Sequence, residues 1–127
     1  MTISIPVPWG EVHDKITILE IKRDHLSDPA KRANVERELA VLTAARDQYA
    51  RPDGLAPLVV RLATINAKLW QIEDDIRACE RRGDFGPAFI DLARAVYRTN
   101  DQRAAVKRQI TDLYGGGLVE EKSYAAY

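Results

Sequence analysis

The strongest constraint in the sequence is a run of apolar residues that recur at alternating steps of four and three positions. Its members are Leu58, Leu62, Ile65, Leu69, Ile72, Ile76 and Cys79. This spacing puts every member on one stripe of an α-helix and is typical of a coiled-coil seam. The pattern therefore predicts a helix from about Pro57 to Gly83, roughly 38 Å long at ~1.5 Å per residue, that packs lengthwise against another helix.

Three further segments carry apolar residues at helical spacing. They run from about Gly10 to Leu26, from Pro29 to about Ala50, and from Gly86-Pro87 to Tyr114. The β-branched run 16–18 leaves a strand as the alternative for the first segment, but its length favours a helix. Because short connections between long helices favour antiparallel neighbours, we expect an all-α fold. The predicted fold is an antiparallel bundle of about four helices with a long helical hairpin, formed by residues 1–127 as a single helical domain.

Both ends of the chain are expected to lie outside the helices. Residues 3–8 alternate apolar positions with serine and prolines, which predicts a short extended N-terminal arm. The glycines at 115–117 end the last helix, and residues 118–124 read as a docked C-terminal arm. In this interpretation Tyr124 anchors in a groove and Lys122 reaches the last helix. A frayed terminus is the alternative.

The charge and cysteine content exclude several classes of protein. The 19 Lys and Arg residues balance 19 Asp and Glu residues, so the chain lacks the positive field of a dedicated nucleic-acid binder. Cys79 is the only cysteine, so no internal disulfide forms. No apolar run approaches the roughly 18 residues that a membrane span needs. We expect a cytoplasmic protein that binds neither nucleic acid nor membrane.

The sequence shows no complete metal or cofactor motif. The acidic cluster Glu73-Asp74-Asp75 points in different directions around a helix, so a solvated face is favoured over a metal site. His13 and His25 lie twelve positions apart, which is roughly 18 Å along a helix and too far to share a metal. No phosphate-binding glycine loop or nucleophile elbow is present. We therefore expect no metal and no cofactor.

The apolar stripe of the last predicted helix is interrupted by polar residues at its midpoint. Thr99 and Arg103 stand where Val96 and Val106 predict apolar residues. Arg23 interrupts the stripe of the first helix in the same way. Buried arginines need carboxylate partners, and the candidates are Glu20, Glu73 and Asp101. The candidate ligand-binding residues are Tyr97, Asn100, Asp101, Arg103, Lys107, Glu20, Arg23 and Lys122.

Two interpretations of this polar band stay open. It is either a structural layer that fixes helix register and oligomeric state, or a pocket for an anionic small molecule. In the pocket, Arg103 and Lys107 would hold a phosphate or carboxylate while Asn100 and Tyr97 orient it.

Four strings of the sequence resemble a family of short bacterial proteins to which no function is assigned. They are DKITILEIK at 14–22, LWQIED at 69–74, AVYRTND at 95–101 and EEKSY at 120–124. Some members of that family occur beside or fused to glycosyltransferase-like modules. The resemblance implies a link to surface-polysaccharide or nucleotide-sugar metabolism, and it suggests that the first helix, the polar band and the C-terminal arm meet in space.

The abundance of seam positions and the absence of catalytic motifs favour an interaction or assembly module. We expect a homo-oligomer that also has a protein partner. The alternative is a small enzyme or sensor that binds a phosphorylated or nucleotide-sugar ligand at the polar band.

Overall fold

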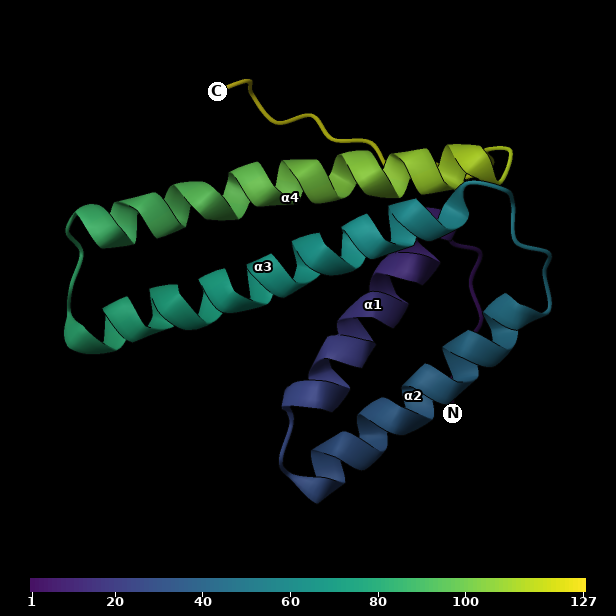
Figure 1. Cartoon of the computed structure of the whole chain (residues 1–127), viewed down its shortest axis with the longest axis horizontal. Helices are drawn as coiled ribbons and strands as arrows, with labels where there is room; N and C mark the ends of the chain where they lie inside the picture. Colours follow the sequence, from purple (N-terminus) through teal and green to yellow (C-terminus); the bar gives the residue numbers. More distant parts are fainter.

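A computed structural model describes all 127 residues and confirms the all-α fold (Figure 1). It contains four helices and no strand: α1 (Trp9–His25), α2 (Pro29–Asp47), α3 (Leu55–Arg82) and α4 (Pro87–Leu113). Each helix begins and ends within three residues of its predicted bounds. None of the four is long and apolar enough to cross a membrane.

The helix ends follow from local sequence signals. The Asp28 side chain accepts hydrogen bonds from the backbone N–H groups of Ala30 and Lys31, and Pro29 occupies the first turn of α2. A carboxylate at this position satisfies N–H groups that have no partner within the helix. Gly83 ends α3 with a φ of 66°, a left-handed conformation that glycine adopts without strain.

The four helices form two antiparallel hairpins that are joined through α1. The α1–α2 hairpin diverges from the longer α3–α4 hairpin, as Figure 1 shows. Helix α1 contacts all three other helices, whereas α2 contacts only α1. The half of the α3–α4 hairpin at its connecting loop has no other helix beside it.

The apolar core is divided into two clusters. One lies between α3 and α4 and consists of Leu55, Leu62, Ile65, Val106 and Ile110. The other lies between α1 and α2 and consists of Ile16, Leu19, Val35 and Leu39. The polar residues buried along α1, α3 and α4 belong to neither cluster. The α1–α2 hairpin is therefore attached to the α3–α4 hairpin through the residues of α1 that face α3 and α4.

Helix α1 lies directly against the backbone of α4 at Gly10. The Gly10 N–H donates a hydrogen bond to Oγ1 of Thr111 at 3.0 Å. A Cβ atom added at Gly10 would lie 2.2 Å from the backbone oxygen of Lys107. Only glycine permits this approach, because any side chain would push the two helices apart.

The C-terminal arm lies along α4, but Tyr124 does not anchor it. Lys122 reaches Asp101 of α4 at 3.6 Å, as expected. The Tyr124 side chain is 84% exposed, so its predicted place in a groove is wrong. The Lys122 ammonium lies 5.7 Å from the Tyr124 ring centroid, and it is Tyr127 that packs against Tyr97. Charge pairing on α4 orients the arm, which leaves this aromatic side chain in solvent.

We predict that Gly10→Ala lowers the free energy of unfolding by about 1–3 kcal/mol, because α1 must move away from the α4 backbone. Urea denaturation measures the change. Gly86→Ala is the control, since its Cβ would meet only the flexible Asp84 side chain at 3.3 Å. An equal loss in both variants would contradict the role of the close approach.

Candidate functional site

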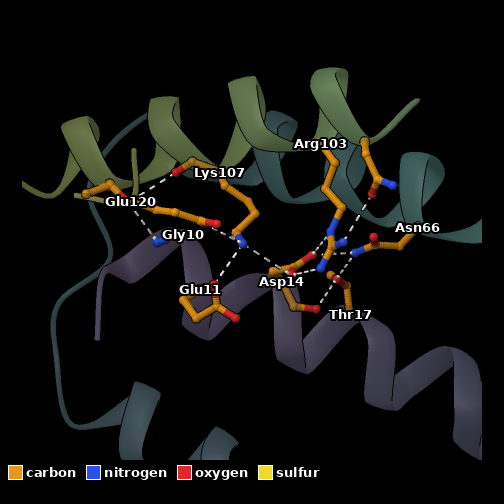
Figure 2. A network of polar contacts seen from close by, with 10 residues as sticks. Gly10, Glu11, Asp14, Thr17, Asn66, Arg103, Lys107 and Glu120 are labelled. Atoms are coloured by element: carbon orange, nitrogen blue, oxygen red, sulfur yellow. Dashed lines mark hydrogen bonds and ion pairs between the residues drawn. The ribbon is translucent and has the colours of Figure 1, made fainter. Parts of the chain in front are cut away.

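A layer of polar side chains, the polar layer, lies where α1 meets α3, α4 and the C-terminal arm. It consists of Glu11, Asp14, Thr17, Asn66, Arg103, Lys107 and Glu120. Its centre is the carboxylate of Asp14, which α1 buries against α4. The side chain of Asp14 is 1% exposed. Its two oxygens accept from Nε and one terminal nitrogen of Arg103, at 2.9 and 2.5 Å (Figure 2). This two-point pairing fixes the position and the orientation of both side chains.

Helix α3 contributes Asn66 to the same layer. The Asn66 amide donates to Asp14 at 2.9 Å and to the hydroxyl of Thr17 at 2.8 Å. That hydroxyl in turn donates to the backbone oxygen of Asp14 at 2.8 Å. Three helices thus meet in one closed set of hydrogen bonds, as Figure 2 shows.

Lys107 extends the layer toward the N-terminus of α1 and the C-terminal arm. Its ammonium lies 2.7 Å from Glu11, 3.1 Å from Glu120 and 3.6 Å from Asp14. The Lys107 side chain is only 12% exposed. The arm therefore supplies a carboxylate at the point where α1 and α4 meet, which agrees with the expectation that these elements lie together.

The electrostatic balance keeps both partners of the central pair charged. Burial raises the pKa of Asp14, but hydrogen bonds from Arg103 and Asn66 and the charges of Arg103 and Lys107 lower it more, so the net pKa is below 3.8. The hydrogen bond to Asp14 raises the pKa of Arg103, with burial opposing it. Burial lowers the pKa of Lys107, but the hydrogen bond to Glu11 and the charge of Asp14 outweigh it, so that this pKa is raised.

An aromatic cluster lies next to the polar layer at the N-terminal end of α1. The Trp9 ring stacks on Tyr114 with 4.1 Å between centroids. His13 is 3% exposed, and its Nε2 lies 3.0 Å from the Tyr114 hydroxyl. Burial, followed by the positive charges of Arg46 and Arg51, lowers the pKa of His13 to about 4. The imidazole is therefore neutral at pH 7.

Most predicted site residues of α4 and the arm lie in or beside this layer. Arg103 and Lys107 belong to it, and Asn100 accepts a long hydrogen bond of 3.4 Å from Arg103. Asp101 pairs with Lys122. Tyr97 is 42% exposed, and its ring centroid lies 5.1 Å from that of Tyr127. Thr99 is 1% exposed, so the midpoint of α4 does turn polar side chains inward.

Glu20 and Arg23 do not join the layer, contrary to the expectation. Arg23 is not buried: its side chain is 39% exposed and pairs with its neighbour Asp24 at 3.3 Å. The two predicted residues line a shallow depression between α1 and α2. The reason is that the C-terminal half of α1 faces α2 rather than α4. The third candidate partner, Glu73, pairs with Arg77 one turn further along α3.

Sequence reasoning missed three residues of the polar layer: Asp14, which pairs with Arg103, and Thr17 and Asn66, which both contact Asp14. Asp14, Thr17 and Asn66 are all buried. A signal for the first two was present, because Gly10, Asp14 and Thr17 follow one another at steps of four and three. A stripe of small and polar residues at this spacing marks a second face of α1. Asn66 had no comparable signal beyond its place beside Ile65 in the seam.

The geometry of the layer is that of a closed structural contact. Every buried side-chain nitrogen and oxygen in the chain has a hydrogen-bond partner. A cavity of about 30 Å³ beside Lys107, Thr111 and Glu120 has room for about one water molecule. No group of three or more His, Cys, Asp or Glu side chains is placed to hold a metal ion. An external anion would reach Lys107 only by displacing Glu120.

Comparison of the chain with protein-family models, with curated protein sequences and with solved structures finds no match.

We predict that Asp14→Ala lowers the free energy of unfolding by about 3–5 kcal/mol, because it leaves Arg103 partly buried without its partner. Chemical denaturation at pH 7 measures this loss. The control is Glu73→Ala, which breaks a pair whose side chains are 49% and 78% exposed. That change is expected to cost less than about 1 kcal/mol. A loss of similar size in both variants would show that the layer contributes no more than a surface ion pair.

Protonation of His13 is expected to make the stability depend on pH. Because its pKa is lowered from 6.5 to about 4 on folding, the unfolded chain binds more protons between these values. Stability is expected to fall by roughly 3 kcal/mol as the pH drops through this window. His13→Gln should remove most of the fall, whereas the exposed His25→Gln should leave it unchanged. Urea titrations at successive pH values provide the measurement, and a wild-type curve that is flat from pH 6.5 to 4 would refute this.

Proposed function

We propose that this protein is an assembly module that self-associates through the distal half of its α3–α4 hairpin. We define the distal hairpin as residues 67–98, the part of α3 and α4 beyond Asn66 and Thr99. The observation that carries the proposal is the amount of apolar surface that this part leaves uncovered. The closed polar layer supports the same conclusion, because its charged groups are already paired within the chain.

The whole chain exposes more surface than a compact protein of its size. Its accessible surface is 8,769 Å² for a mass of 14.3 kDa. A compact monomer of this mass exposes about 6,800 Å². The excess of about 2,000 Å² comes from the elongated hairpins and the two arms. The excess of one chain is larger than the area that each partner buries in a stable protein interface, about 800 Å².

The distal hairpin has apolar side chains that no third helix covers beyond Trp70, which contacts His25 of α1. Ile72 and Cys79 are its only buried residues. Leu69, Ile76, Phe89, Leu92 and Val96 are half-buried. Phe85, Ile90 and Tyr97 are exposed by 55%, 52% and 42%. Two helices alone cannot enclose a seam, since each buries only the stripe that faces the other.

A second copy of the chain is the occupant that fits this surface best. The end of α1 reaches Trp70, whose ring centroid lies 4.9 Å from that of His25. Beyond Trp70, α3 continues for 12 residues, roughly 18 Å, without a covering helix. Two such hairpins packed together form a four-helix bundle in which each covers the seam of the other. A two-fold axis gives both copies the same contact surface. The zero net charge removes long-range repulsion between copies.

The test is the mass in solution of the wild type and of Ile90→Glu, measured by size exclusion with light scattering. We expect the wild type to have about twice the monomer mass of 14.3 kDa. Ile90 is already 52% exposed in the single chain, so the substitution should leave the helices intact and weaken association at least about tenfold by burying a carboxylate at the interface.

The matched control is Val41→Glu, which introduces the same charge at a 67% exposed position on α2. It should leave the mass unchanged. A wild type that stays monomeric at the highest soluble concentration would contradict the proposal. Equal dissociation of both variants would place the interface elsewhere.

A further inference from the structure

A groove lies between α3 and α4, and none of its lining residues belongs to the polar layer. Its volume is about 330 Å³. It is lined by Lys68 of α3 and by Asp91, Arg94, Ala95, Arg98, Thr99 and Gln102 of α4. Each of the α4 residues has another of the set three or four positions away, so they project from one side of the helix. The volume is at the lower end of the range for small-molecule sites, about 300–1,000 Å³.

The groove carries an excess of unpaired positive charge. Lys68, Arg94 and Arg98 take part in none of the ion pairs of the structure. Asp91 is the one carboxylate among the lining residues. This arrangement contrasts with Arg103 and Lys107, whose charges are balanced by carboxylates of the chain itself.

Thr99 is a buried residue whose hydroxyl group is not fully enclosed and makes no hydrogen bond within the protein. The residue is 1% exposed. Every side-chain oxygen that is fully enclosed has a hydrogen-bond partner, but the Thr99 hydroxyl makes none of the hydrogen bonds of the structure. The small exposed area of this residue therefore includes its oxygen, and the groove is the space onto which Thr99 opens. A polar group in such a place is available to a ligand.

We propose that this groove binds the phosphoryl group of a small phosphorylated metabolite. Arg94 and Arg98 present planar groups of N–H donors that match phosphate oxygens, and Lys68 adds a cation from the opposite helix. The Thr99 hydroxyl donates to the phosphate from the floor of the groove. Asp91 accepts a hydrogen bond from a hydroxyl group of the same metabolite. The proposal does not rest on self-association, because all of these residues belong to one chain.

The test uses pyrophosphate as the probe and isothermal titration calorimetry as the measurement. We expect saturable binding of one pyrophosphate per chain. Arg98→Gln and Thr99→Val should each weaken it about tenfold or more, since each removes a hydrogen bond to a charged ligand. Thr99→Val replaces a hydroxyl that has no partner in the protein by a methyl group, so the fold should remain. Thr99→Ser keeps the hydroxyl and should retain binding.

The control for total charge is Arg81→Gln, which removes one unpaired cation at the C-terminal end of α3, outside the groove. It should bind pyrophosphate as the wild type does. If Thr99→Val fails to fold, Arg94→Gln replaces it, because this exposed side chain makes no contact that the fold requires. Pyrophosphate binding is also measured with the Ile90→Glu variant, which is expected to be monomeric. Binding by this variant would show that the groove does not depend on self-association.

Three results would overturn the proposal. The first is a wild type that shows no saturable binding. The second is a loss in Arg81→Gln as large as in Arg98→Gln, which would show a diffuse charge effect. The third is binding that increases in Glu120→Gln and is unaffected by Arg98→Gln and Thr99→Val, because the anion would then lie against Lys107 in the polar layer.

Discussion

The buried ion pair between Asp14 and Arg103 is the interaction on which the arrangement of the helices depends. A carboxylate that is 1% exposed would cost several kcal/mol if it lacked a partner. Helix α1 can therefore cross α3 and α4 only where Arg103 and Asn66 both reach Asp14. Gly10 permits the approach of the two backbones that this crossing needs. The pair specifies position more than it adds stability, since apolar residues of equal size could bury the same area.

The position of this crossing also determines which surfaces remain open. Helix α1 has 17 residues and α3 has 28, so α1 covers only part of the longer hairpin. The uncovered part carries the exposed apolar residues of the proposed interface and, on a different set of residues, the basic groove. The two proposed functions therefore have one structural origin, the short length of the helix that joins the hairpins.

The helices and the polar band could be predicted from sequence because both are properties of a single segment. Apolar spacing, Pro29 and Gly83 mark the helices, and Thr99 and Arg103 break the spacing of α4. The spacing of Gly10, Asp14 and Thr17 marks the polar face of α1, but the pairing of Asp14 with Arg103 could not be predicted, because it depends on the angle at which α1 crosses α4. Spacing along one helix does not encode that angle. The error at Arg23 has the same origin, since the far end of α1 turns toward α2.

The separation of the core into two clusters has a consequence for folding. Each hairpin consists of helices that are adjacent in sequence, so its contacts are local and are expected to form early. Docking of α1 on α3 and α4 joins residues as far as 101 positions apart and comes last. A chain that lost the polar layer would therefore populate an intermediate, with helices formed and the two hairpins moving independently. The transition would no longer be two-state, and circular dichroism would report less unfolding than a probe of the distance between the hairpins.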